Sequence, residues 1–265
     1  MKITVFTSNQ PRHLALISAL ASVGDEVYAI QECNTVRPGE GADSSGKSDV
    51  MKDYFQRVLA AERAVFGPGG FCPPQVRQWA IRMGDLNLLG LSDFGPALDA
   101  DVFVVFGSSY IKGKLAQFLV QHGAYNIHMG TSPYYRGSAT NFWALYDGRP
   151  QYVGATIHLL TAGLDSGPML FHALPPAEAT EPFLLGMIAV RAAQQGLVQS
   201  LADGSLQTMV PVPQDHTRQL RYARNADFTD EVAAEYLRRV PSAQMIQQSL
   251  EGREMTDFVR PFIGQ

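Results

Sequence analysis

Cysteine is scarce in this sequence, and its scarcity excludes two classes of protein. Cys33 and Cys72 are the only two cysteines among 265 residues, and no Cys-x-x-Cys or Cys/His ligand spacing surrounds them. A disulfide scaffold needs several cysteine pairs, and a structural zinc site needs clustered cysteines and histidines. We therefore expect no metal site, and we predict a protein of a reducing compartment, the cytoplasm.

A long apolar run and an excess of basic residues are also missing. The N-terminal apolar stretch is interrupted from Asn9 to His13 before a signal-peptide core could form. No stretch approaches the roughly 20 apolar residues that a membrane span needs. The net charge is −4, which gives no general attraction to phosphate backbones. These observations predict neither a membrane partner nor a nucleic-acid partner.

The sequence does contain enough apolar residues for a large core. Hydrophobic residues make up 46% of the chain and charged residues 17%, which suits one α/β domain with or without a small appendage. A strand over 2–6, a helix over 12–24 and a strand over 26–32 form a βαβ opening, which favours a parallel sheet. No Gly-x-Gly-x-x-Gly motif is present there, so a dinucleotide site has no direct support.

Strands and helices are predicted to alternate along most of the remaining chain. Strands are expected over 101–109, 124–130, 151–160 and 168–176, and helices over 50–67, 112–123, 138–148, 182–204 and 226–240. The polar, Gly- and Ser-rich residues 34–49 favour a loop. We predict an open, mostly parallel twisted sheet with flanking helices, a Rossmann-like α/β fold, as a catalytic domain over 1–208. A short C-terminal helical extension is expected over 209–265.

Three polar side chains suit chemistry at a carbonyl group. Asn126 and His128 end a predicted strand and, being two residues apart, face the same side of the sheet. Open α/β sheets bind ligands at the carboxyl ends of their strands. Asp165 lies between two glycines in "GLDSG", which permit a tight bend and the close approach of a ligand. An amide and a protonated imidazole can donate to an oxyanion, and a carboxylate can orient the imidazole and relay a proton.

In this order, the motifs resemble those of the folate-dependent formyltransferases. The resemblance is carried by "NIHMGTSPYYRG" (126–137), "WALYDG", "VGATIHLL" and "GLDSG", and it covers residues 75–175 well and residues 1–32 loosely. The family includes methionyl-tRNA, glycinamide ribonucleotide and nucleotide-sugar N-formyltransferases. Met129 and Gly130 replace its usual Pro-Ser after the histidine, and Ser166 replaces a threonine.

The resemblance implies an enzyme that moves the formyl group of 10-formyltetrahydrofolate to an amine, with no metal. It implies that Asn126 and His128 stabilise the oxyanion and that Asp165 assists proton transfer. The folate is expected between "FGSSYIKGKL" (106–115) and "TAGLDSG" (161–167), held largely through backbone groups. The predicted folate-binding residues are Phe106, Gly107, Ser108, Gly163 and Leu164.

The predicted acceptor is a small amine, with the amino group of a nucleotide-linked sugar as the first candidate. Relatives that formylate tRNA add a C-terminal barrel, which the short predicted extension could not form. Gln10, Arg12 and His13 follow the first strand, where a helix N-terminus would favour a phosphate. Tyr134 and Arg136 are further candidate substrate-binding residues. Simple packing of Tyr134 and bracing of its loop by Arg136 are the alternatives.

Other interpretations stay open at this point. The acceptor could be a free amino acid or another metabolite amine, and hydrolysis of the same folate uses a similar triad. A non-catalytic binding module could also share the fold, although neither His128 nor Asp165 has been lost. The remaining histidines, His158 and His172 among them, have no ligand spacing and are predicted to be structural. Residues 221–228 could close over the site or form a homodimer contact.

Overall fold

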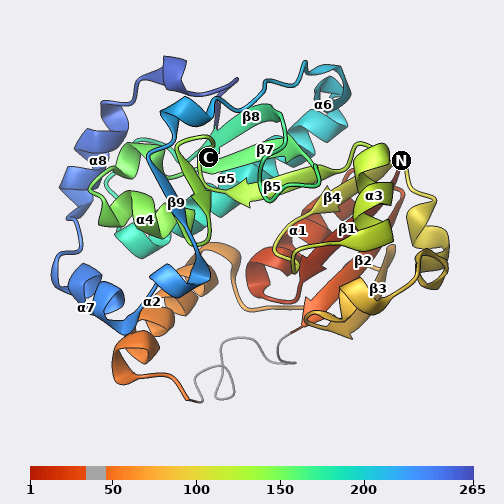
Figure 1. Cartoon of the computed structure of the whole chain (residues 1–265), viewed down its shortest axis with the longest axis horizontal. Coiled ribbons are helices and arrows are strands. Elements are labelled where there is room, and N and C mark those ends of the chain that lie inside the picture. The colour runs from red at the N-terminus through yellow and green to blue at the C-terminus, as the bar shows by residue number, and fades with distance from the viewer. Residues whose placement is uncertain (34–45) are drawn as a thin grey trace.

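Runs of β-branched and aromatic residues become the strands of one central sheet, as their buried pattern predicts. The computed structural model describes residues 1–33 and 46–265 (Figure 1). Within these residues the main sheet has the order β10-β8-β7-β5-β4-β1-β2-β3, and β6 and β9 pair separately. The strands are β1 Lys2–Ser8, β2 Glu26–Cys33, β3 Val76–Arg82, β4 Val102–Val105, β5 Tyr125–Met129, β6 Tyr135–Gly137, β7 Ala155–Leu159, β8 Met169–Leu174, β9 Arg221–Ala223 and β10 Phe262–Ile263.

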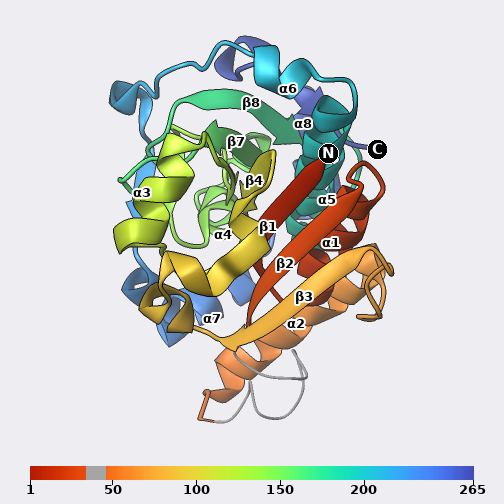
Figure 2. The same cartoon turned by 90° about the vertical axis from the view of Figure 1, so that its right-hand side faces the viewer.

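The helices flank this sheet on both faces. They are α1 Pro11–Ala21, α2 Asp49–Phe66, α3 Gly113–Gln121, α4 Thr140–Tyr146, α5 Pro182–Ala202, α6 Ser205–Thr208, α7 Asp230–Arg238 and α8 Ala243–Glu251. Figure 2 shows α3 on one face of the sheet and α1 and α5 on the other. Accordingly, one buried cluster joins α1 and α5 to the sheet, and another joins α3 to the opposite face. Residues 34–45, part of the predicted loop, lie outside the described residues.

The direction of the strands changes across the sheet. Five adjacent strands run parallel to one another, as the βαβ opening predicts: β3, β2, β1, β4 and β5. β7 pairs antiparallel with both β5 and β8. The prediction of a mostly parallel α/β sheet with flanking helices is therefore confirmed. The antiparallel register pairs Leu159, the last residue of β7, with Tyr125, the first residue of β5, so the loop after β7 lies beside the start of β5.

Residues after 208 contribute two helices and pair with the rest of the chain through strands. α7 packs beside α2 (Figure 1), and β10 extends the main sheet next to β8. β9 pairs with β6, and β6 is the strand that comes directly after the loop following β5. The Arg221 guanidinium binds the Asp147 carboxylate at 2.7 and 2.9 Å. The domain boundary at residue 208 stays a prediction. The loop that follows β5 is held in place by residues that come after this boundary.

Within the described residues, no helix combines the length and the apolar character that crossing a membrane requires.

His172 on β8 is a buried neutral histidine that links three segments. Its Nε2 lies 2.7 Å from the Ser132 carbonyl oxygen, and its Nδ1 accepts from the Val259 amide at 2.8 Å. Burial lowers the pKa of His172 to about 4. The ring therefore carries its proton on Nε2 and stays uncharged near neutral pH. Its structural role agrees with the prediction made for it.

We expect the free energy of unfolding to decrease as the pH falls from 6.5 toward 4. In this window the unfolded state protonates His172 near the ordinary pKa of 6.5, while the folded state does not. The contribution of His172 to the free energy of unfolding is therefore fully present above pH 6.5. About 2 kcal/mol of it is lost between pH 7 and pH 5. Urea unfolding at both pH values measures the loss. His172→Asn should lose less stability than the wild type. His122→Asn, which changes an exposed histidine, should lose as much as the wild type. Equal losses in the wild type and both variants would show that His172 is not the source of the pH dependence.

Candidate functional site

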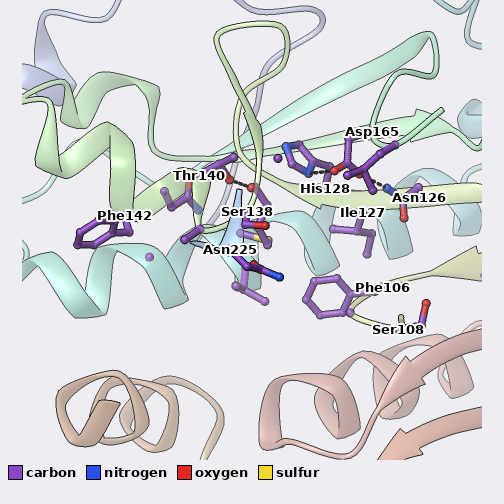
Figure 3. Close-up of a pocket in the computed structure, with 18 of the residues that line it drawn as sticks. Phe106, Ser108, Asn126, Ile127, His128, Ser138, Thr140, Phe142, Asp165 and Asn225 are labelled. Carbon is purple, nitrogen blue, oxygen red and sulfur yellow. Dashed lines mark hydrogen bonds and ion pairs between the residues drawn. The ribbon is translucent and has the colours of Figure 1, made fainter. Parts of the chain in front are cut away.

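Asn126, His128 and Asp165 meet at one edge of the sheet (Figure 3). β5 carries the first two, and the loop between β7 and β8 carries Asp165. Asn126 Nδ2 lies 3.2 Å from Asp165 Oδ1, and His128 Nδ1 lies 3.3 Å from Asp165 Oδ2. The structure therefore brings together the three side chains that the sequence singled out. Their catalytic roles stay predictions.

The Asp165 carboxylate is held in its ionised form by its neighbours. Burial raises its pKa, but the charge of His128 and the hydrogen bond from His128 lower it by more, so that the pKa of Asp165 lies below its ordinary value. Asp165 also has a φ of 47°, in the left-handed region that a non-glycine residue seldom adopts. Such backbone strain concentrates at functional sites. An ionised Asp165 can orient His128 and stabilise its protonated ring.

His158 is a fourth member of the cluster, and its contact with Asn126 was not predicted. Its Nδ1 lies 2.8 Å from the Leu159 carbonyl oxygen, and its Nε2 lies 2.9 Å from Asn126 Nδ2. A carbonyl oxygen only accepts, so Nδ1 carries the proton and Nε2 accepts from the amide. Burial lowers the pKa of His158 to about 4, which keeps the ring neutral.

The histidine contact determines how the Asn126 amide is oriented. One amide hydrogen faces His158 and the other faces Asp165, so both are already committed. Figure 3 shows the amide nitrogen turned toward Asp165 and the oxygen turned away from it. The atom that Asn126 leaves for a ligand is thus its oxygen, a hydrogen-bond acceptor. This differs from the predicted role as a donor to an oxyanion.

A cavity of about 710 Å³ lies beside the cluster, and all five predicted folate-binding residues line it. Gly107 has a φ of 71°, and a Cβ there would lie 2.5 Å from His13 Nε2. Glycine at 107 therefore meets both a conformational and a steric requirement. His13 is buried, with its ring 5.1 Å from that of Phe106, so it supports this wall from behind.

Arg12 is the one predicted substrate-binding residue that lines the cavity. Its Nη1 lies 2.9 Å from Oε1 of the buried Glu62, and its backbone amide donates to the same oxygen at 3.0 Å. Gln10 immediately precedes α1, and it lies outside the lining.

Tyr134 and Arg136 also lie outside the lining of the cavity. Tyr134 is buried, and its hydroxyl donates to the Asp257 carbonyl at 3.0 Å. Arg136 Nη1 lies 3.1 Å from His216 Nδ1 and 3.3 Å from Gln219 Oε1. The geometry matches the alternatives of packing for Tyr134 and loop bracing for Arg136. The predicted contacts with a substrate are not supported.

The other side of the cavity was missed by the sequence prediction. Its walls come from α2, α4, α5 and α7 and include Tyr54, Phe142, Phe183 and Tyr236. These four side chains lie on helices far apart in the chain, and no local motif connects them. Helical spacing of such side chains indicates packing, which is also part of what they do.

Comparison with known proteins supports the resemblance. Residues 91–183 match the family model described as formyl transferase. A methionyl-tRNA formyltransferase from Synechococcus sp. (strain JA-3-3Ab) is 34% identical over 125 residues, which are 46% of this chain and 38% of that protein. The first relatives of this kind are matched over only 22–38% of their own length.

Solved structures share the fold at low sequence identity. A 4-N formyltransferase from Francisella tularensis superposes with a TM-score of 0.55 at 15% identity, over 86% of this chain and 77% of that one. A phosphoribosylglycinamide formyltransferase from Anaplasma phagocytophilum gives 0.51 at 16% identity, over 78% and 88%. The predicted resemblance and the predicted fold are confirmed.

Proposed function

Because residues 91–183 match the formyl transferase family, we propose that this chain transfers the formyl group of 10-formyltetrahydrofolate to the primary amine of a small molecule. The observation that carries the proposal is the arrangement of His128, Asp165 and Asn126 beside a large cavity. An imidazole, a carboxylate and an amide can activate a carbonyl group without a protein nucleophile.

The side of the cavity near Phe106 and Leu164 fits a flat folate ring. Val105, Ile111 and Leu160 supply apolar walls, and Gly107 and Gly163 let the backbone come close. Binding sites of this kind combine apolar walls with a few polar groups that fix the orientation of the ligand. The folate supplies an activated formyl group and takes up a proton once that group has left.

His128 is assigned to the developing negative charge on the formyl oxygen. Its Nδ1 is held by Asp165, and its Nε2 lies 3.4 Å from the Tyr135 carbonyl oxygen. That contact is long for a strong hydrogen bond, so Nε2–H can exchange it for a better acceptor. The ionised Asp165 stabilises the charged ring and can accept a proton that the amine loses. The Asn126 oxygen can accept an amine N–H and so direct the nitrogen lone pair.

The acceptor predicted from the sequence is a nucleotide-linked amino sugar, and tRNA is the rival that the curated relatives suggest. The protein should be incubated with 10-formyltetrahydrofolate and, separately, charged initiator tRNA, nucleotide-linked 3- and 4-amino sugars, and free amines. Mass spectrometry of the acceptor and release of tetrahydrofolate report the transfer. Efficient formylation of tRNA would overturn the small-amine proposal. Release of tetrahydrofolate with formate and no formylated amine would indicate the hydrolase instead.

Gly163→Val is expected to weaken the binding of a folate analogue about tenfold or more, a loss of about 1.4 kcal/mol. A Cβ at 163 would lie 2.3 Å from Ser166 Oγ, so this hydroxyl would have to turn away from Thr161, and the valine side chain would narrow the cavity beside Leu164. The position is exposed, so the melting temperature should change little. Gly70→Val is the control, because a Cβ at that exposed glycine meets no atom within 4 Å. Equal folate affinity in both variants would show that the donor side has been misplaced.

A further inference from the structure

The cavity wall farthest from Asp165 is mainly apolar and aromatic. Tyr54 on α2, Phe142 on α4 and Tyr236 on α7 pack edge to face, with the Phe142 ring centroid 5.7 Å from that of Tyr54 and 5.0 Å from that of Tyr236. Phe183 and Met187 of α5 complete the wall. Figure 3 shows Phe142 beyond Ser138 and Thr140, on the side away from Asn126. The group that meets this wall is therefore in contact with ring faces and methylenes.

The described lining offers almost no charge to a second ligand. Arg12 and Asp165 are the only charged side chains, histidine aside, among the described residues that line the cavity. Asp165 belongs to the catalytic cluster, and Arg12 is already paired with the buried Glu62 at 2.9 Å. Phosphate groups are bound by cations and by clusters of free N–H donors. A diphosphate inside this cavity would face no cation that lacks a counter-charge.

Two tyrosines that line the wall leave their hydroxyls without a partner among the described residues. Tyr54 is 9% exposed and Tyr236 is 2% exposed, and neither hydroxyl bonds to any of the residues the structure describes. By contrast, the hydroxyls of the buried Tyr134 and Tyr135 donate to Asp257 and Asp147. A hydroxyl that bonds to no described residue, on a side chain that lines a cavity, is available to a ligand. These phenols can donate to or accept from a hydroxyl.

We propose that the acceptor is a primary amine on a compact, uncharged apolar ring that carries a hydroxyl and no phosphate. The ring packs against Phe142 and Phe183, and the hydroxyl bonds to Tyr54 or Tyr236. The proposal rests on the proposed formyl transfer, and it replaces the nucleotide-linked sugar predicted from the sequence with an acceptor that carries no phosphate. Transfer forms the new N–C bond to the formyl carbon and breaks the bond to folate nitrogen. One proton leaves the amine and one is taken up by that nitrogen.

Two matched pairs of amines test the charge requirement. The first pair is tyramine and its phosphate ester, and the second is methyl 4-amino-4,6-dideoxyglucoside and the corresponding dTDP-linked sugar. We expect kcat/KM to be at least tenfold higher for the phosphate-free member of each pair. An equal or higher kcat/KM for the phosphate-bearing member of either pair overturns the inference about the acceptor. The proposed formyl transfer would still stand.

Binding of a folate analogue, measured by fluorescence titration, separates the two levels of failure. If the protein binds the analogue but formylates no phosphate-free amine, the inference about the acceptor is wrong. If the protein neither binds the analogue nor releases tetrahydrofolate, the proposed function is wrong as well.

The hydroxyls are tested with Tyr54→Phe and Tyr236→Phe, which keep the rings in place. At least one variant should raise KM for tyramine about tenfold, without changing KM for phenethylamine, which lacks the hydroxyl. Folate affinity and the melting temperature should stay at the wild-type values. Tyr222→Phe is the control, because Tyr222 is 46% exposed and lies outside the lining. An unchanged KM for tyramine in both variants overturns the assignment of the hydroxyls.

Discussion

His128→Ala should lower kcat by about 10²–10³ and leave a folded protein, since losing one donor to a developing oxyanion has an effect of this size. The side chain lies at the cavity wall, and apart from Asp165 its one polar contact is the long one to the Tyr135 carbonyl. Its removal therefore breaks few polar contacts and enlarges a cavity that already exists. Single-turnover formyl transfer, with circular dichroism for folding, measures the effect.

His122→Ala is the matched control for this variant. His122 is exposed at the end of α3 and lies outside the cavity lining, so its removal should leave turnover near the wild-type value. Near-normal turnover in folded His128→Ala would remove the imidazole from the mechanism.

Asp165→Asn is expected to be at least as damaging, with a loss of about 10³ or more. The substitution keeps the size of the side chain but removes the charge that stabilises protonated His128 and the base that takes up a proton. Because the folded pKa of Asp165 is depressed, protonation of this carboxylate should affect the rate only below its ordinary pKa value of 3.8. Any acid limb of the pH–rate profile that comes from Asp165 should be absent from the variant.

The pH–rate profile distinguishes a catalytic Asp165 from a turn residue. Asp53→Asn, which changes an exposed carboxylate on α2, should leave both the rate and the profile unchanged. If Asp165→Asn lowers the rate but keeps the wild-type profile, Asp165 only shapes its loop.

Local patterns were sufficient to predict the strands at the centre of the sheet. β1 and β4 are short runs of β-branched and aromatic residues that the sheet buries, so their sequences reflect burial directly. β3 was not predicted, because this edge strand alternates exposed charged residues with half-buried ones. β6, β9 and β10 have two or three residues each, too few for any periodicity.

The proximity of the predicted catalytic residues was easier to predict than the surroundings of these residues. Asn126, His128 and Asp165 lie in short motifs with recognisable spacing. The contact of His158 depends on the antiparallel register that places it opposite Asn126, and no local pattern encodes a register between β5 and β7. The burial of Tyr134 likewise depends on Asp257, a residue from the far end of the chain. Long-range pairing, which sequence periodicity does not report, explains both differences.

The pairing of β6 with β9 has a consequence for the order of events during synthesis. β6 follows the loop beside β5, and the Tyr134 carbonyl accepts from the backbone amides of Leu220 and Arg221. A nascent chain can assemble β1, β2 and β4 early, but this loop lacks its partner until residues 220–223 have left the ribosome. The reactive cluster therefore reaches its final geometry only late in translation. A growing polypeptide passes through a stage in which most of the sheet has formed but the loop beside β5 still lacks its partner strand.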